Sequence, residues 1–137
     1  MAKYLKDSAT ITQRGVTITG DGEGTDGVLG IVKLNSEDRM NKKVDVICYW
    51  YVNLDHKTND EKNPFHSFVF SIEGDDFDTY ISKEPQEDES EKYLLMFHRA
   101  YKYITDKKAL YELYVGDPDN AEYATYTKYA IFKDIVN

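Results

Sequence analysis

A run of alternating side chains at residues 44–54 limits the fold more than any other part of the sequence. One face of this run is apolar and consists of Val44, Val46, Cys48, Trp50, Val52 and Leu54. The opposite face consists of Asp45, Ile47, Tyr49, Tyr51 and Asn53. Successive side chains of a β-strand point to opposite sides, so this run predicts a strand with one face in a core and the other partly covered by tyrosines.

Other segments of the first 80 residues are suited to pair with this strand. The strongest is 65–72, which places His66, Phe68, Phe70 and Ile72 on one face. The polar segment 55–64 would join the two strands as the loop of a hairpin. Further strands are expected within 8–19 (one strand with a bulge or two short strands), at 28–34 and at 79–81, with the polar residues 35–43 as a connection.

The C-terminal third of the chain has helical periodicity. Residues 87–104 are expected to form a helix, with Asp88 as its cap and Glu91 completing a capping box. Its buried stripe is expected to consist of Leu94, Phe97, Tyr101 and Ile104. A second helix is expected at 106–115, with Asp106 as its cap and Gly116 as its end.

Residues 121–136 carry signals for both helix and strand. Their Tyr, Thr and Ile content favours a strand, whereas Tyr126, Ala130 and Lys133 have helical spacing, and we favour a helix. Together the elements predict an α+β fold, in which an antiparallel sheet of about four or five strands from the N-terminal two-thirds is covered by C-terminal helices. The chain, 1–137, is expected to form a single domain.

The composition is typical of a folded, soluble domain in a reducing compartment. Hydrophobic residues make up 41% of the 137 residues, enough for a core without disulfides or metals. Cys48 is the only cysteine, which excludes an intramolecular disulfide. The first residues lack the apolar region of a secretory signal, and no run approaches the roughly 18 apolar residues of a membrane span, so we expect a cytoplasmic location and no membrane partner.

The charge of the chain is concentrated in one acidic segment. The net charge is −8, which disfavours direct nucleic-acid binding because phosphates are repelled. Nine carboxylates lie between positions 73 and 91, with Lys83 as the only cation among them: Glu73, Asp75, Asp76, Asp78, Glu84, Glu87, Asp88, Glu89 and Glu91. Such a field suits a basic partner, and the simpler alternative is a solvated loop with a helix start.

Tyrosines are crowded into the C-terminal third of the chain. They are Tyr93, Tyr101, Tyr103, Tyr111, Tyr114, Tyr123, Tyr126 and Tyr129. Tyrosine combines a large contact area with a polar tip, which suits a protein interface. The alternative is that these rings form the boundary of an amphipathic core.

The glycine-rich loop at 20–27 is a weak cofactor signal. Gly22, Gly24 and Gly27 have dinucleotide-loop spacing, but the residues that follow favour a strand where that motif requires a helix. The acidic residues of the same loop are also a poor calcium site, because the twelfth position of an EF-hand loop, its bidentate ligand, would be Val32. An exposed loop is the better interpretation, and no cofactor is expected.

One cluster could carry acid–base or metal chemistry. A hairpin between the two best strands would bring together Asp55, His56, Asp60, Glu61 and His66. Composition alone would often produce such a cluster, so we expect neither a metal site nor a catalytic residue there. Cys48 lies on the apolar face of its strand and is expected to be a core residue, not a nucleophile.

Three functional hypotheses remain open at this point. The favoured one is a non-catalytic protein that binds another protein, as an assembly subunit or a small inhibitor, through the nine carboxylates and the tyrosine-rich surface. Its partner would be a protein with a basic surface or a further copy of the chain. The second hypothesis narrows this to an acidic nucleic-acid mimic that inhibits a nuclease or other nucleic-acid-binding protein. The third is a small metal-dependent hydrolase that uses Asp55, His56 and His66.

Overall fold

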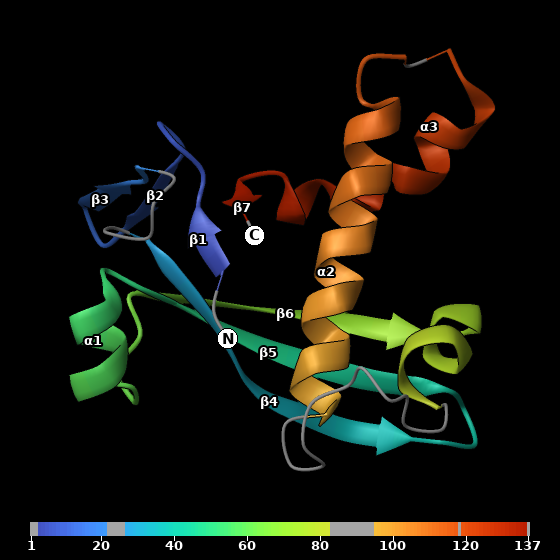
Figure 1. The fold of residues 1–137 in the computed structure, drawn as a ribbon, viewed down its shortest axis with the longest axis horizontal. Coiled ribbons are helices and arrows are strands. Elements are labelled where there is room, and N and C mark those ends of the chain that lie inside the picture. Colours follow the sequence, from blue (N-terminus) through green and yellow to red (C-terminus); the bar gives the residue numbers. More distant parts are fainter. Residues whose placement is uncertain (1–2, 22–26, 83–94, 118, 137) are drawn as a thin grey trace.

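The alternating run forms strand β5 (Lys43–Tyr51), which lies between β4 (Val28–Asp38) and β6 (His66–Glu73) in an antiparallel sheet. The computed structural model describes residues 3–21, 27–82, 95–117 and 119–136 (Figure 1). The predicted apolar face is buried at Val44, Val46, Cys48 and Trp50, each at most 6% exposed. The strand is thus confirmed, although β5 ends earlier than expected and β4 extends into the predicted connection at 35–43.

Two short strands complete the five-stranded sheet, whose order is β6-β5-β4-β1-β7. β1 (Lys3–Leu5) pairs antiparallel with both β4 and β7 (Ile135–Val136), so the first and the last strand lie side by side (Figure 1). Leu5 and Ile135 are each 1% exposed and join these strands to the core. The sequence predicted neither strand, because runs of two or three residues are too short to show a period.

Residues 8–19 form two short strands, which was one of the two predicted alternatives. β2 (Thr10–Gln13) and β3 (Val16–Thr19) pair antiparallel as a separate two-stranded sheet. The turn between them has positive φ at Arg14 (53°) and Gly15 (78°), the backbone geometry that suits a two-residue hairpin turn.

Two predictions around β5 and β6 were wrong, because helical turns occupy these positions. Part of the expected loop at 55–64 is the helix α1 (Leu54–Asn59), which is capped by the side chain of Asn53. The expected strand at 79–81 is a π-helical turn, η1 (Phe77–Ile81). Phe77, Tyr80 and Ile81 are all buried, and their spacing of three and four residues fits a helical turn, so packing overrides the β propensity of Tyr and Ile.

One long helix, α2 (Leu95–Tyr114), crosses the sheet where two helices were expected (Figure 1). The predicted stripe is buried at Tyr101 and Ile104. Asp106 does not cap a helix start. Its carboxylate instead accepts a hydrogen bond from the Tyr80 hydroxyl (2.7 Å) and lies 3.7 Å from Lys102 Nζ. The start of the predicted helix, with Asp88, Glu91 and Leu94, falls outside the described residues.

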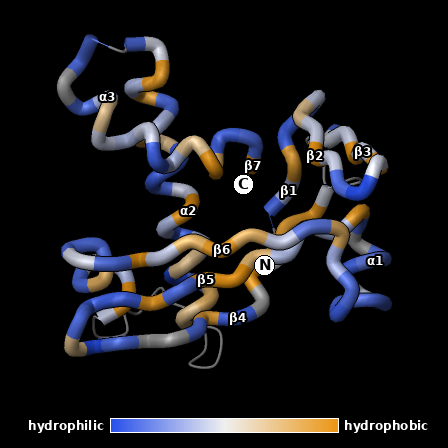
Figure 2. Tube along the Cα trace, turned by 180° about the vertical axis from the view of Figure 1, so that it is seen from behind, coloured by the Kyte–Doolittle hydropathy of each residue, from blue (hydrophilic) through white to orange (hydrophobic). Residues whose placement is uncertain are grey.

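The chain continues into α3 (Ala121–Tyr126) and the 3₁₀ helix η2 (Thr127–Phe132) before β7. The favoured helix at 121–136 is thus confirmed except for the last strand. The α+β fold is confirmed as well, since the C-terminal helices lie against the sheet, with Phe70 of β6 at 5.6 Å from the Tyr103 ring and 5.0 Å from the Phe132 ring. Figure 2 shows apolar stretches along β5 and β6 and a hydrophilic α1.

Among the described residues, no helix combines the length and the apolar composition that crossing a bilayer requires.

A buried hydrogen bond connects α2 to an irregularity in β4. The register of β4 on β5 shifts between Ile31 and Lys33, so Val32 is an extra residue in the ladder. The Ile31 N–H donates to the hydroxyl of Tyr101 on α2 at 2.8 Å. A β-bulge disrupts the regular ladder, and here a side chain from the covering helix supplies the acceptor.

We predict that Tyr101→Phe lowers the free energy of unfolding by about 1–3 kcal/mol, because the Ile31 N–H then has no acceptor in the core. Urea unfolding followed by circular dichroism measures this change. Tyr111→Phe is the matched control on the same helix. Its hydroxyl makes no hydrogen bond in the described part of the chain, and we expect a change within about 0.5 kcal/mol. Equal effects of the two variants would contradict the assignment.

Candidate functional site

Four carboxylates of the acidic segment lie at the end of β6 and in the turn that follows it. They are Glu73, Asp75, Asp76 and Asp78, which we call the acidic turn. Two of them are ion-paired. Asp76 Oδ1 lies 2.9 Å from Lys107 Nζ, and Asp78 Oδ2 lies 2.7 Å from Lys42 Nζ, where this hydrogen bond raises the pKa of Lys42. Glu73 and Asp75 are exposed and have no ion-pair partner among the described residues.

The other five predicted partner-binding residues lie outside the described residues: Glu84, Glu87, Asp88, Glu89 and Glu91. Within the described part of the chain, the structure therefore brings together four of the nine carboxylates and neutralises two of these with lysines from other elements. That leaves less uncompensated charge at the acidic turn than the sequence alone predicted.

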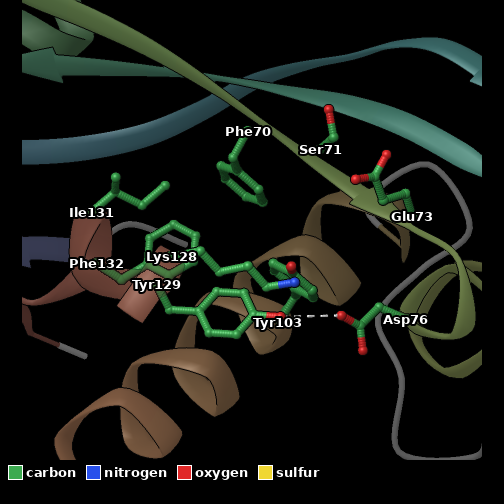
Figure 3. Close-up of a pocket in the computed structure, with 9 residues that line it drawn as sticks. All are labelled: Phe70, Ser71, Glu73, Asp76, Tyr103, Lys128, Tyr129, Ile131 and Phe132. Carbon is green, nitrogen blue, oxygen red and sulfur yellow. Dashed lines mark hydrogen bonds between the residues drawn. The ribbon is translucent and has the colours of Figure 1, made fainter. Parts of the chain in front are cut away.

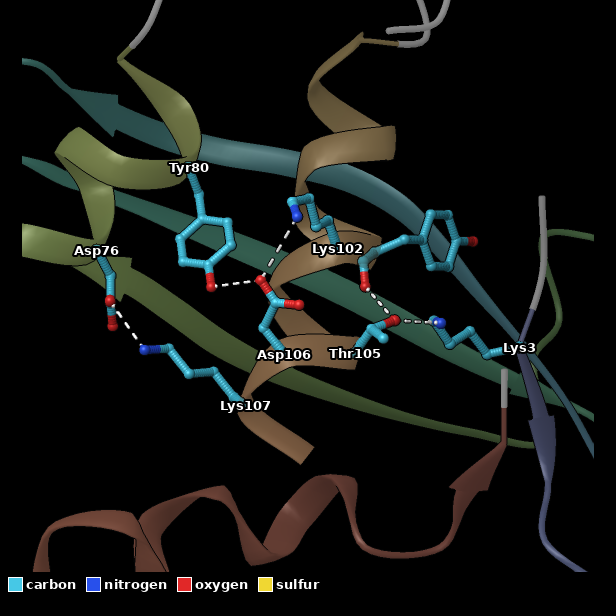
Figure 4. A network of polar contacts seen from close by, with 8 residues as sticks. Lys3, Asp76, Tyr80, Lys102, Thr105, Asp106 and Lys107 are labelled. Carbon is cyan, nitrogen blue, oxygen red and sulfur yellow. Dashed lines mark hydrogen bonds and ion pairs between the residues drawn. The ribbon is translucent and has the colours of Figure 1, made fainter. Parts of the chain in front are cut away.

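Lys107 of α2 is buried inside an aromatic enclosure formed by Tyr80, Tyr103 and Tyr129. Figure 4 shows Lys107 with its ion pair to Asp76 and with Tyr80 nearby. Lys107 Nζ lies 5.8, 5.6 and 5.3 Å from the centroids of the three rings, which come from η1, α2 and η2. A cation over aromatic faces is attracted by their quadrupoles, and more strongly when it is removed from water. Asp76 supplies the compensating negative charge, so the cation is paired as well as enclosed.

The hydroxyls of the aromatic enclosure are poorly suited to catalysis. Burial raises the pKa of Tyr80 and Tyr103 above the usual range of tyrosine, so both phenols stay protonated near neutral pH. The Tyr80 hydroxyl donates to Asp106 at 2.7 Å, and the Tyr129 hydroxyl is 3.5 Å from Asp76 Oδ2. The network holds three elements together, and it presents no ionised nucleophile.

A pocket of about 210 Å³ lies between β6 and η2, beside the acidic turn (Figure 3). We call it the β6 groove. It is lined by Phe70, Ser71, Glu73, Asp76, Tyr103, Lys128, Tyr129, Ile131 and Phe132. Four of these nine residues are aromatic. Ile131 is 54% exposed, and Lys128 Nζ lies 5.1 Å from the Tyr129 ring. The groove thus combines apolar contact area with charges of both signs at its rim.

The outer edge of β6 is open along the same side. Gly74 N–H donates to the Lys42 carbonyl (3.0 Å), which continues the uninterrupted β5–β6 register and orients the backbone groups of Phe68, Phe70 and Ile72 towards β5. The N–H and C=O groups of Ser67, Val69 and Ser71 consequently point away from the sheet. In the described part of the chain, no backbone hydrogen bond reaches them.

This edge lacks the features that usually block strand addition. β6 is eight residues long and contains no lysine, no proline and no bulge. Val69, on the face of the sheet away from the core, is 58% exposed. The opposite edge of the sheet, β7, has only two residues.

Sequence reasoning identified β6 as a strand but not as an edge, since strand order depends on long-range pairing. The absence of charged residues and proline from 66–72 was the signal available.

In the predicted histidine cluster, the ring of His56 is not free to bind a metal ion. Val52 N–H donates to His56 Nδ1 (3.0 Å), and His56 Nε2–H donates to the Asn63 carbonyl (2.7 Å), so both ring nitrogens are used by the backbone. Asp60 accepts from the Asn63 side chain at 2.6 Å. Within the described ranges, no three residues of the His, Cys, Asp and Glu types are grouped to hold a metal ion. His56 thus stabilises the connection between α1 and β6.

The remaining predicted chemical groups are buried or outside the described residues. Cys48 is fully buried, and burial raises the pKa of its thiol, as expected for a core residue. Residues 22–26 of the glycine loop lie outside the described residues.

The tyrosines of the C-terminal third belong partly to the core. Tyr101, Tyr103 and Tyr129 are each at most 6% exposed. The half-buried members are Tyr111, Tyr114, Tyr123 and Tyr126, and Tyr93 lies outside the described residues. The Tyr114 and Tyr126 rings stack at 5.2 Å and connect α2 to α3. Among the described tyrosines of this third, the partly exposed ones therefore lie on α2 and α3.

No protein-family model matches the chain, and no curated protein or solved structure is detectably similar to it.

We predict that Asp76→Asn lowers the free energy of unfolding by about 1–3 kcal/mol, because it leaves the buried Lys107 cation without its counter-charge. Adding Lys107→Met should recover at least half of this loss, since methionine keeps apolar contact with the three rings and removes the charge. Urea unfolding of the two single variants and the double variant gives the coupling energy.

Asp78→Asn is the control for this comparison, because it breaks an ion pair whose side chains are 51% and 49% exposed. We expect a change within about 1 kcal/mol. A loss for Asp78→Asn as large as that for Asp76→Asn would refute the role assigned to the enclosed pair.

We predict that alkaline pH destabilises the fold between pH 10 and 12. Burial raises the pKa of Tyr51 and of Tyr101 from 10.0 to about 12, so unfolding releases protons in this window and stability falls as pH rises. Lys3 has the opposite effect on stability just below pH 10.5. Burial lowers its pKa, so unfolding takes up a proton there and stability rises with pH. The net effect on stability is measured from the midpoint of urea unfolding at each pH, and tyrosinate absorbance reports the ionisation of the tyrosines. Ionisation of all twelve tyrosines near pH 10 with unchanged stability would contradict it.

Proposed function

We propose that this protein is non-catalytic and acts by binding another protein, either as a subunit of an assembly or as a small inhibitor. The observation that carries the proposal is the open outer edge of β6, bordered by the β6 groove and the acidic turn. An exposed edge of this kind accepts a strand from another chain through backbone hydrogen bonds, while neighbouring pockets select the side chains.

Charge at the end of the edge would add selectivity. Glu73 and Asp75 are exposed and without an ion-pair partner in the described ranges, so they favour a partner that places cations beside this end of β6. The ion pairs of Asp76 and Asp78 leave less free charge for imitation of a phosphate backbone. A protein partner that pairs with the edge is therefore preferred over the nucleic-acid mimic.

A non-catalytic role is supported by the state of the reactive side chains. The His56 ring nitrogens are engaged with backbone groups, Cys48 is buried, and Tyr103 is held in its protonated form. Each of these groups stabilises the fold in a way that removes it from reaction with a substrate.

Val69→Lys tests the proposal, because a charge on an edge strand blocks the addition of a further strand. Tagged protein is used to capture partners from the native extract, which are identified by mass spectrometry at low and high salt. We expect wild type to retain a stoichiometric partner and Val69→Lys to lose it. If Glu73 and Asp75 contribute, capture weakens as salt rises.

Val16→Lys provides the control, since Val16 on β3 is 57% exposed and Val69 is 58% exposed, so both variants add the same charge at equal exposure. It should capture the partner as wild type does. Identical capture by all three proteins, or no capture by a wild type that is also monomeric, would refute binding through β6.

A further inference from the structure

We infer that the β6 edge pairs with the β6 edge of a second copy of this chain, antiparallel across a two-fold axis at Val69. The inference rests on the proposed function, because it names the partner of the same edge.

The sequence of β6 is symmetric about Val69. It reads Ser67-Phe68-Val69-Phe70-Ser71, which is identical in both directions. Antiparallel pairing centred on Val69 therefore places serine opposite serine, phenylalanine opposite phenylalanine and valine opposite valine. A two-fold interface is self-complementary by definition, and this strand meets that condition residue by residue.

The backbone has the matching orientation. Ser67, Val69 and Ser71 are the residues whose N–H and C=O groups point to the open edge. With the axis at Val69, each of them lies opposite another member of the same set, so each pair exchanges both N–H···O=C bonds. An axis placed one residue along would pair Ser71 with Val69 and also satisfy the backbone, but it would lose the Val69–Val69 contact.

The side chains exposed along the edge become covered in this arrangement. Val69 meets its own copy on the outer face of the sheet, where each is now 58% exposed. On the inner face, Phe68 of the second copy lies opposite Phe70, on the side where Ile131 and Phe132 line the β6 groove. The half-buried Phe68 and the exposed Ile131 thereby gain apolar contacts that the single chain does not provide.

The acidic turns do not oppose this pairing. Glu73 is four residues from the axis, so antiparallel strands place the two copies of Glu73 about 27 Å apart at a rise of about 3.4 Å per residue. This separation exceeds the Debye length of about 8 Å at physiological ionic strength. Parallel pairing would instead bring the two acidic turns side by side, so charge selects the antiparallel arrangement.

The pairing also ends at two copies. It uses the long open edge of the five-stranded sheet in each chain. Among the described strands, the other edge of that sheet is β7, whose two residues are too few to add a further strand. The product is one continuous antiparallel sheet across both copies, with both α2 helices on the same face of that sheet.

Sedimentation equilibrium of the full chain over a concentration series tests the inference. We expect a wild-type monomer–dimer equilibrium and a dissociation constant raised at least about tenfold by Val69→Lys, because two lysines then face each other at the axis. Val16→Lys should dimerise as wild type does. Circular dichroism with urea unfolding checks that all three proteins are folded.

Val69→Cys gives an independent readout that does not depend on weakening the interface. Opposed residues that exchange hydrogen bonds have Cα atoms about 5.5 Å apart, a distance that a disulfide can span. Mild oxidation should yield a cross-linked dimer of Val69→Cys and none of Val16→Cys, since Cys48 is buried. A wild-type monomer at high concentration, together with no Val69→Cys cross-link, overturns the inference.

The two proposals fail in different ways. A monomeric chain that captures a different protein through Val69 disproves the dimer and keeps the proposed function. A monomeric chain whose capture is insensitive to Val69→Lys disproves both. A dimer insensitive to Val69→Lys disproves the β6 interface.

Discussion

The buried ion pair between Lys107 and Asp76 is the constraint on which the arrangement around β6 depends. An ammonium group among tyrosine rings is unfavourable without a counter-charge, and Asp76 supplies it at 2.9 Å. Because the three rings come from η1, α2 and η2, the pair fixes these elements against one another. The carboxylate also fixes the turn directly after β6. The position of the acidic turn is thus a consequence of satisfying a cation in α2.

The same arrangement explains why one edge of the sheet stays open. α2 lies across the sheet and contacts β4 through the Tyr101 hydroxyl, while Tyr103 packs on Phe70 of β6. η2 reaches β6 through Phe132, which packs on the inner face rather than pairing with the backbone. The C-terminal elements therefore cover the apolar face, and no strand among the described residues pairs with the outward-pointing backbone groups of Val69 and its neighbours.

Local periodicity was sufficient to predict the elements that carry it and insufficient for the rest. β5 and β6 alternate over enough residues to identify their buried faces, and the stripe of α2 identified Tyr101 and Ile104. η1 and β7 are set by burial and pairing with distant segments, which leave no local period. Asp76 and Asp78 belonged to a predicted acidic field, yet their lysine partners are 31 and 36 positions away in the sequence, beyond what spacing rules detect. The aromatic enclosure of Lys107 likewise has no local signal, because its rings come from three separate elements.

An open, regular edge strand normally favours aggregation with other chains. A net charge of −8 would be expected to oppose such aggregation by repulsion between chains. Charge alone does not protect β6, because its central residues are uncharged and Val69 is exposed. Glu73 and Asp75 sit at one end only, where they disfavour parallel stacking of like ends and leave antiparallel pairing open. Pairing about Val69 would occupy each edge with the one strand whose sequence and backbone orientation match it. The edge would then be closed by the symmetry of β6, with no need for a lysine, a proline or a bulge within the strand.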